Sequence, residues 1–161
     1  IKMNTTRSFI ERLFSLFITL FILLWASIPI HEGFHYLAAK SLGIQATINL
    51  NWEASGTTTY YVNATEIQRT IISFAGGIGT GLLFTFLWYV ACIQMIYTIC
   101  EIDNSFSFCL MSLYQYFYSP LDYFNLWQNQ FLILLVALLA ISISLFIYGK
   151  KLFLWLFLLK E

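Results

Sequence analysis

Residues 14–35 read FSLFITLFILLWASIPIHEGFH, and this stretch decides both how the chain folds and where its chemistry lies. Residues 14–30 carry no charge and are typical of a membrane-spanning helix. The run ends in His31, Glu32 and His35, which form an H-E-x-x-H motif. Residues four apart share one face of a helix, so the two imidazoles can bind one zinc ion and leave Glu32 free as a general base. Ionisable groups are costly at this depth, which makes a functional site the first hypothesis.

The composition of the whole chain agrees with a membrane protein. Of the 161 residues, 60% are hydrophobic and only 10% are charged, which is far from the balance of a soluble domain. The net charge is zero and there is no basic block, so we expect the lipid bilayer and other membrane proteins as partners, and no nucleic acid. Cys92, Cys100 and Cys109 have no metal-type spacing and are expected to be reduced.

Four apolar segments organise the chain, and they cover residues 13–39, 71–99, 106–118 and 131–148. They predict an α-helical, multi-pass integral membrane protein with about four transmembrane helices in a single domain, residues 1–161. We expect Pro29 to kink the first helix and Pro120, in Ser119-Pro120-Leu121-Asp122, to interrupt the third. The first apolar run continues into the histidine motif without a small-residue cleavage site, which is not typical of a signal peptide.

Between the first two apolar segments the sequence becomes polar and β-like. Residues 44–62 alternate apolar and polar side chains, are rich in β-branched residues and contain a glycine, Gly56, between two such runs. This pattern predicts a small interfacial β-hairpin or sheet between the first and second helices.

The second helix opens with a run of small residues, A-G-G-I-G-T-G at 75–81. Gly77 and Gly81 form a GxxxG pair, and such pairs let membrane helices approach closely. A packing seam is the favoured interpretation, and packing does not exclude a catalytic role beside it.

Two histidines do not complete a catalytic zinc site, which usually has three protein ligands and a water. Among the few remaining carboxylates, only Asp122 lies in an apolar, aromatic stretch beside a proline, where metal coordination would compensate for its burial. Asp122 is therefore the candidate third ligand. Two plainer interpretations stay open: Asp122 as a helix N-cap, and a chance H-E-x-x-H motif whose side chains reach the interface.

Three segments follow one another along the chain: H-E-G-F-H at 31–35, A-G-G-I-G-T at 75–80 and P-L-D at 120–122. Their order and spacing resemble the minimal core of the site-2 protease family of intramembrane zinc metalloproteases, over residues 13–126. That family has H-E-x-x-H late in one span, a surface β-region, Ala-Gly-Pro-x-x-Asn at the start of the next span, and a ligand aspartate in a Pro-x-Leu-Asp-Gly-like segment. This chain departs from the pattern at three positions, where Gly77, Thr80 and Tyr123 replace proline, asparagine and glycine.

The resemblance implies a zinc metalloendopeptidase with Zn²⁺ as its cofactor. His31, His35 and Asp122 would bind the zinc, and Glu32 would take a proton from the attacking water and pass it to the leaving amine. The substrate would be a transmembrane or membrane-proximal segment unwound to a strand, which the β-region could receive by edge addition. The candidate substrate-positioning residues are Gly76, Gly77, Thr80 and Asn125.

Two other classes of function are compatible with the sequence. A catalytically silent homologue, acting as a structural or regulatory membrane subunit, suits Thr80 at the position of the family asparagine. A metal transporter would need further ionisable residues along the spans, and these are scarce. The transporter therefore ranks third.

The basic residues predict an orientation in the membrane. Lysines and arginines concentrate on the side of the two termini, whereas the other side has only Lys40 and Arg69, so the positive-inside rule places both termini in the cytoplasm and the histidine motif toward the outer face. A glycosylation sequon, Asn63-Ala-Thr65, agrees with this placement, whereas the site-2 protease family places its zinc nearer the cytosol. An interfacial aromatic belt is expected from Tyr114, Tyr116, Tyr118, Tyr123 and Trp127.

Overall fold

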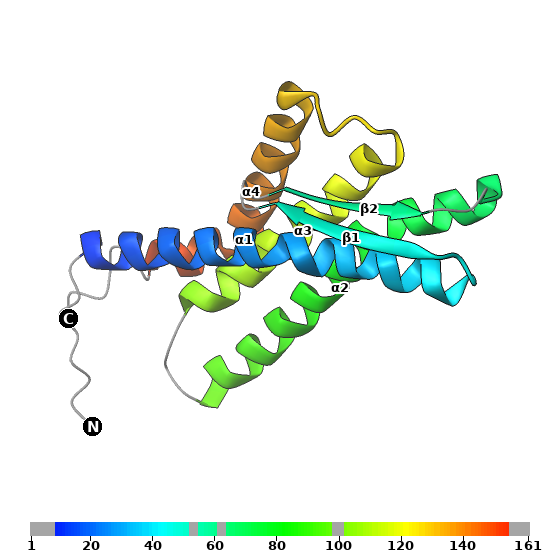
Figure 1. Cartoon of the computed structure of the whole chain (residues 1–161). Coiled ribbons are helices and arrows are strands. Elements are labelled where there is room, and N and C mark those ends of the chain that lie inside the picture. Colours follow the sequence, from blue (N-terminus) through cyan, green and yellow to red (C-terminus); the bar gives the residue numbers. More distant parts are fainter. Residues whose placement is uncertain (1–8, 52–54, 61–63, 98–101, 155–161) are drawn as a thin grey trace.

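The computed structural model describes residues 9–51, 55–60, 64–97 and 102–154, which form four helices and one two-stranded sheet (Figure 1). The helices are α1 (Phe9–Ser41), α2 (Glu66–Tyr97), α3 (Ile102–Tyr123) and α4 (Gln130–Phe153), and the strands are β1 (Ala46–Asn51) and β2 (Ser55–Tyr60). The two strands pair antiparallel, from Ala46 opposite Tyr60 to Asn51 opposite Ser55. The predicted sheet between the first two helices is thus confirmed. Val62, Asn63 and Cys100 lie outside the described residues.

Three of these helices are long and apolar enough to cross a membrane: Leu13–Ser41 within α1, Glu66–Ile93 within α2, and α4. The sequence predicted four membrane-spanning helices, and the fourth, α3, is not apolar enough to be counted with the other three. Its buried polar side chains are Ser105, Ser107, Ser112, Gln115 and Ser119. α3 can carry them because it packs against each of the other three helices, which shield it.

Neither proline inside a helix ends it. α1 continues through Pro29 to Ser41, so the histidine motif stands on helical backbone, and the expected kink stays a prediction. α3 continues through Pro120 to Tyr123, so the predicted interruption there is wrong. Pro120 removes one backbone donor, but its neighbours hold the turn in place, since Ser119 donates a hydrogen bond to the Phe74 carbonyl at 3.2 Å and Leu121 is buried.

The glycines of α2 let this helix approach both α1 and α3. A Cβ built on Gly77 would lie 2.5 Å from the Ser119 Cβ of α3, and one on Gly79 would lie 2.4 Å from the Phe34 ring of α1. A Cβ on Gly81 would likewise meet the Tyr116 ring at 2.6 Å. The predicted packing seam is therefore present, and glycine is required at these positions because no side chain fits between the helices.

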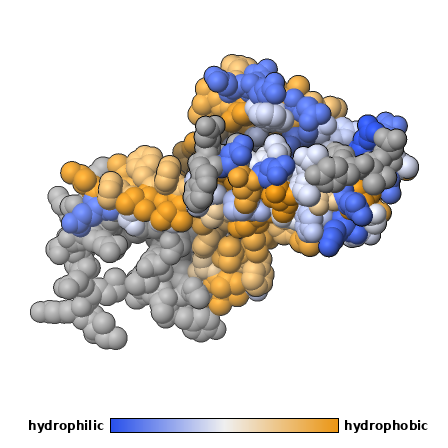
Figure 2. All heavy atoms as spheres, in the orientation of Figure 1, coloured by the Kyte–Doolittle hydropathy of each residue, from blue (hydrophilic) through white to orange (hydrophobic). Residues whose placement is uncertain are grey.

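Two apolar clusters mark the two ends of the bundle. One joins the start of α1 and α3 to the end of α4 and consists of Leu16, Phe106, Cys109, Tyr148 and Leu152. The other joins the end of α1 to the start of α2 and consists of Ala39, Ile44, Ala64 and Ile72. Hydrophilic residues gather around the end of α1, the start of α2 and the α3–α4 connection, whereas the first half of α1 and the second half of α2 are hydrophobic (Figure 2).

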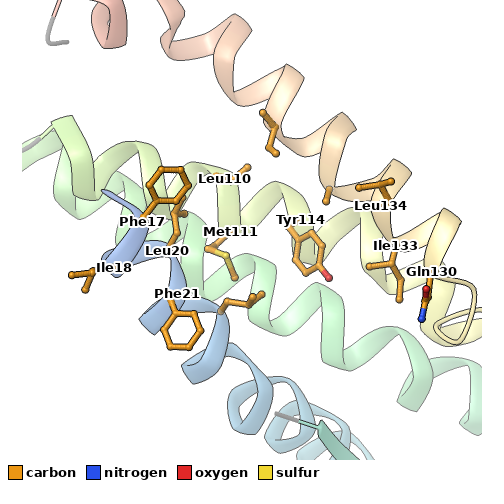
Figure 3. Close-up of a pocket in the computed structure, with 13 residues that line it drawn as sticks. Phe17, Ile18, Leu20, Phe21, Leu110, Met111, Tyr114, Gln130, Ile133 and Leu134 are labelled. Atoms are coloured by element: carbon orange, nitrogen blue, oxygen red, sulfur yellow. The ribbon is translucent and has the colours of Figure 1, made fainter. Parts of the chain in front are cut away.

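The hairpin lies along the second half of α1 and contacts it through both strands (Figure 1). An apolar groove of about 790 Å³ opens between α1 and α4, over α3 (Figure 3). Phe17 and Phe21 of α1, Tyr114 of α3 and Leu134 of α4 are among the side chains that line it. The histidine motif begins at His31, seven residues after Leu24, which is the last α1 residue that lines the groove. There the hairpin contacts α1 through Thr58 and Glu32.

Candidate metal centre

The three predicted metal ligands meet at one point. His31 and His35 lie one turn apart on α1, and their Nε2 atoms are 3.0 Å from each other. Asp122, in the last turn of α3, places its Oδ2 atom 2.8 Å from His35 Nε2 and 3.3 Å from His31 Nε2. The interpretation of Asp122 as a helix N-cap is wrong, because this residue lies at the opposite end of its helix.

The other nitrogen of each imidazole is already occupied. His35 Nδ1 donates a hydrogen bond to the Ile72 carbonyl oxygen at 2.6 Å, and His31 Nδ1 donates one to Gln115 Oε1 at 3.0 Å. The Ile72 carbonyl can only accept, so His35 Nδ1 carries the proton, and the Gln115 amide oxygen facing His31 Nδ1 favours the same tautomer there. In the neutral rings the Nε2 lone pairs then point at each other and at the Asp122 carboxylate.

With both rings neutral, three acceptors face one another, and only a proton shared with Asp122 or a metal cation between them relieves the repulsion. The structure brings together two imidazole nitrogens and one carboxylate oxygen, which is the donor set that zinc prefers. Hydrogen bonds from metal-bound imidazoles to a carbonyl or side-chain oxygen are also the usual way in which proteins fix the ring tautomer. The two histidines are thus oriented as a pair of ligands before any ion binds.

Gly76 of α2 leaves room beside the two Nε2 atoms. A Cβ built on this residue would lie 2.3 Å from His35 Nε2 and 2.6 Å from His31 Nε2. Any side chain would therefore occupy the space in which an ion bound by these nitrogens has to fit. Gly76 was predicted to position substrate, and its location gives it a more direct role in keeping the centre open.

Glu32 lies beside the centre but is held by the hairpin. One of its carboxylate oxygens is within 4.8 Å of the histidine nitrogens, so Glu32 belongs to the same group of potential ligands. Asp122 is nearer to both imidazoles, and Glu32 Oε2 accepts a hydrogen bond from Thr58 Oγ1 at 2.7 Å. Asp122 is therefore the nearer candidate for the third ligand, and Glu32 lies next to it.

Access to the centre differs among its members. Glu32 is buried, and the side chains of His31 and His35 are 10% and 9% exposed, whereas the Asp122 side chain is 23% exposed. The centre is thus closed on the α1 side and partly open at the end of α3.

The remaining substrate-positioning candidates lie in different surroundings. Gly77 faces Ser119 of α3 and serves helix packing. Thr80 is fully buried, and its hydroxyl has no hydrogen-bond partner among the described residues. Asn125 is exposed, adopts a left-handed φ of 53° and donates its backbone N–H to the Asp122 carbonyl, so it closes the end of α3.

Gln115 and Thr58 are the site residues that sequence reasoning missed. Gln115 lies seven residues before Asp122 and shares its helix face, so its helical spacing from the candidate aspartate was a signal that could have been read. Thr58 is the middle of three consecutive threonines, and only strand alternation distinguishes it from the other two. The role of the Ile72 carbonyl could not be predicted from the sequence, because every residue has a backbone carbonyl.

The tyrosines of α3 contribute to the interior as well as to any aromatic belt. The Tyr118 ring lies edge-on to His31, with centroids 6.0 Å apart, and it contacts Tyr114 at the groove between α1 and α4. Tyr116 shares a hydrogen bond with Thr85 of α2, and Tyr123 stacks on Phe74. The belt itself stays a prediction.

Comparison with known proteins found no relative of this chain. No protein-family model matches the chain, and neither the curated proteins nor the solved structures contain a match.

Proposed function

We propose that this protein is an intramembrane zinc metalloprotease of the site-2 protease type. Zinc would be held by His31, His35 and Asp122, and Glu32 would be the general base. The observation that carries the proposal is the convergence of the two Nε2 atoms and the Asp122 carboxylate, with each Nδ1 engaged by an oxygen atom on its outer side.

The distances among these atoms suit zinc. Ligand atoms about 2.1 Å from a tetrahedral zinc ion lie about 3.4 Å from one another. The three separations of 2.8, 3.0 and 3.3 Å are slightly shorter, so a small outward movement of the ligands would admit the ion. Three protein ligands leave a fourth position for water, and Gly76 provides space at the nitrogen pair.

A membrane location is supported by the three apolar helices and by the large side chains that they expose. In the proposed arrangement α3 crosses with them as a shielded fourth helix. His31 lies ten residues before the end of α1, or about 15 Å along the helix axis. The centre would then lie inside the membrane on the hairpin side, within reach of water from the polar end of the bundle.

The chemistry would be hydrolysis of a peptide bond. A zinc ion held by His31, His35 and Asp122 would lower the pKa of its water to about 7 and would polarise the scissile carbonyl. Glu32 accepts one proton of the attacking water while the water oxygen bonds to the carbonyl carbon. Glu32 then gives that proton to the amide nitrogen as the C–N bond breaks, and the products are a carboxylic acid and an amine.

The substrate would be a transmembrane or membrane-proximal segment in extended form. A helical backbone has its carbonyls engaged in hydrogen bonds, so a strand is the form that can present one to the centre. The hairpin lies next to Glu32 and could receive such a strand by edge addition. The Thr80 hydroxyl, which has no hydrogen-bond partner in the described part of the chain, lies one turn along α2 from Gly76 and is the candidate donor to the substrate backbone.

Glu32→Gln tests the proposal, because the amide keeps the shape of the side chain but cannot accept the proton. The variant and the wild type are purified in parallel, and zinc content and cleavage of a reporter membrane helix are measured on the same preparations. We expect equal, near-stoichiometric zinc and a fall in hydrolysis of about 10²-fold or more in the variant. Zinc-free wild-type protein would contradict the metal site.

A catalytically silent homologue is the second candidate, and Thr80 in place of the family asparagine favours it. In that case both proteins would bind zinc, and the wild type would cleave no membrane reporter. That result would replace the protease by a structural or regulatory membrane subunit.

A further inference from the structure

The hairpin holds the side chain of Glu32 through a hydrogen bond from Thr58. Thr58 Oγ1 is 2.7 Å from Glu32 Oε2 and 3.1 Å from the Glu32 backbone carbonyl oxygen. A hydroxyl has one proton, and the shorter contact to the charged oxygen is the stronger hydrogen bond. The same strand therefore contacts both the main chain and the carboxylate of the proposed general base.

Gly56 brings the strand close enough for this contact. A Cβ built on Gly56 would lie 2.6 Å from Glu32 Cγ, so β2 lies directly against the glutamate side chain. Gly56 and Thr58 share one face of β2 and are partly buried, whereas Thr57 and Thr59 point to the other face and are exposed. Only one hydroxyl of the threonine triplet can reach the centre.

We propose that Thr58 is a positioning residue, which holds one carboxylate oxygen of Glu32 and leaves the other free for the proton transfer. The catalytic part of this inference rests on the proposed function. A glutamate side chain has several rotatable bonds, and a base that is not held loses rate because its oxygen rarely meets the reacting proton. The hairpin thereby becomes part of the catalytic apparatus through a single hydrogen bond.

A positioning role makes a specific kinetic prediction. Thr58→Val keeps the shape of the side chain and removes the donor, so kcat should fall about 10- to 100-fold while KM changes little. Thr58→Ser restores the hydroxyl and should recover most of the rate. Zinc content should be equal in all three proteins, because Thr58 contacts none of the proposed ligands. Thr57→Val, the same change on the exposed face of β2, is the matched control and should behave as the wild type.

A second measurement tests the contact without relying on activity. Amide hydrogen exchange of β1 and β2 is followed on full-length protein with and without added zinc. Thr58→Val and Glu32→Ala should each speed exchange in the hairpin, and the double variant should exchange no faster than the faster single variant, because both remove the same bond.

The outcomes separate this inference from the proposed function. A wild type that cleaves the reporter, with Thr58→Val equally active or Thr58→Ser as impaired as Thr58→Val, overturns the positioning role alone. Additive effects of Thr58→Val and Glu32→Ala on hairpin exchange overturn the contact itself. A wild type that binds zinc but never cleaves removes the proposed function, and the kinetic role of Thr58 goes with it.

Discussion

Two buried polar clusters join the helices of this protein, and they differ in how their donors and acceptors balance. At one end of the bundle, the Tyr148 hydroxyl is shared by Trp88 Nε1, by Ser105 Oγ at 2.7 Å and by Cys92 Sγ at 3.4 Å. Cys92 and Ser105 also contact each other at 3.2 Å. Each of these groups can donate a proton, so the cluster satisfies itself and we regard it as structural.

The centre formed by His31, His35 and Asp122 has the opposite balance. Each Nδ1 has an oxygen partner on its outer side, and with both rings neutral the inner atoms are three acceptors that a proton or a metal ion has to balance. A polar cluster with matched donors stabilises a bundle by itself, whereas one with surplus acceptors is suited to take up a proton or a metal ion. The comparison therefore separates a structural cluster from the candidate metal centre.

Removing a ligand should have the largest effect. His35→Ala deletes one of the two imidazoles, so we expect loss of most of the bound zinc, measured by elemental mass spectrometry of the purified protein. Equal zinc content in the variant and the wild type would show that this centre does not bind the zinc, and the two clusters would then not differ in metal binding.

Filling the space beside the nitrogens should come next. Gly76→Ala would place a methyl group 2.3 Å from His35 Nε2, so zinc binding should fall sharply even though every ligand is retained. The matched control is Gly33→Ala, within the same motif, because a Cβ there meets nothing within 4 Å. If both variants bind zinc as the wild type does, the space at Gly76 has no role in binding.

Loss of support for one ligand should have an intermediate effect. Gln115→Leu removes the oxygen that orients His31, and hydrogen-bond partners of metal ligands typically contribute about 10- to 100-fold to metal affinity. Competition with a chromophoric chelator measures that affinity. An unchanged zinc affinity would show that the tautomer of His31 is fixed in some other way.

A change in the self-satisfied cluster should affect stability but not metal. Tyr148→Phe leaves the Trp88 N–H and the Ser105 hydroxyl without their shared partner, so the free energy of unfolding should fall by about 1–3 kcal/mol. Zinc content should remain that of the wild type. Loss of zinc in this variant would mean that the two clusters are coupled along the bundle.

Local patterns were sufficient to predict much of this molecule. The apolar runs predicted α1, α2 and α4, because an uninterrupted series of apolar residues long enough to form a helix can be read directly from the sequence. Alternation predicted the hairpin, and helical spacing put His31 and His35 on one face. Asp122 was found by elimination, since a lone carboxylate in an aromatic stretch needs a partner.

Other features were invisible because they depend on contacts between distant residues. A proline inside a helix predicts that the helix ends there, so the sequence predicted an interruption at Pro120. α3 continues to Tyr123, because Ser119 and Leu121 pack inward. The GxxxG pattern identified Gly77 and Gly81 as packing residues, but only the crossing of α1 and α2 puts Gly76 against the imidazoles.

The helices, the hairpin and the chemical identity of the candidate ligands could be predicted, because they follow from periodicity and from the cost of burying charge. That the atoms of His31, His35 and Asp122 lie together, that Gln115 and the Ile72 carbonyl orient the rings, and that Thr58 holds Glu32 is visible only in the folded chain. Those relations are set by packing across 26 to 91 residues of chain, and such packing leaves no local pattern to read.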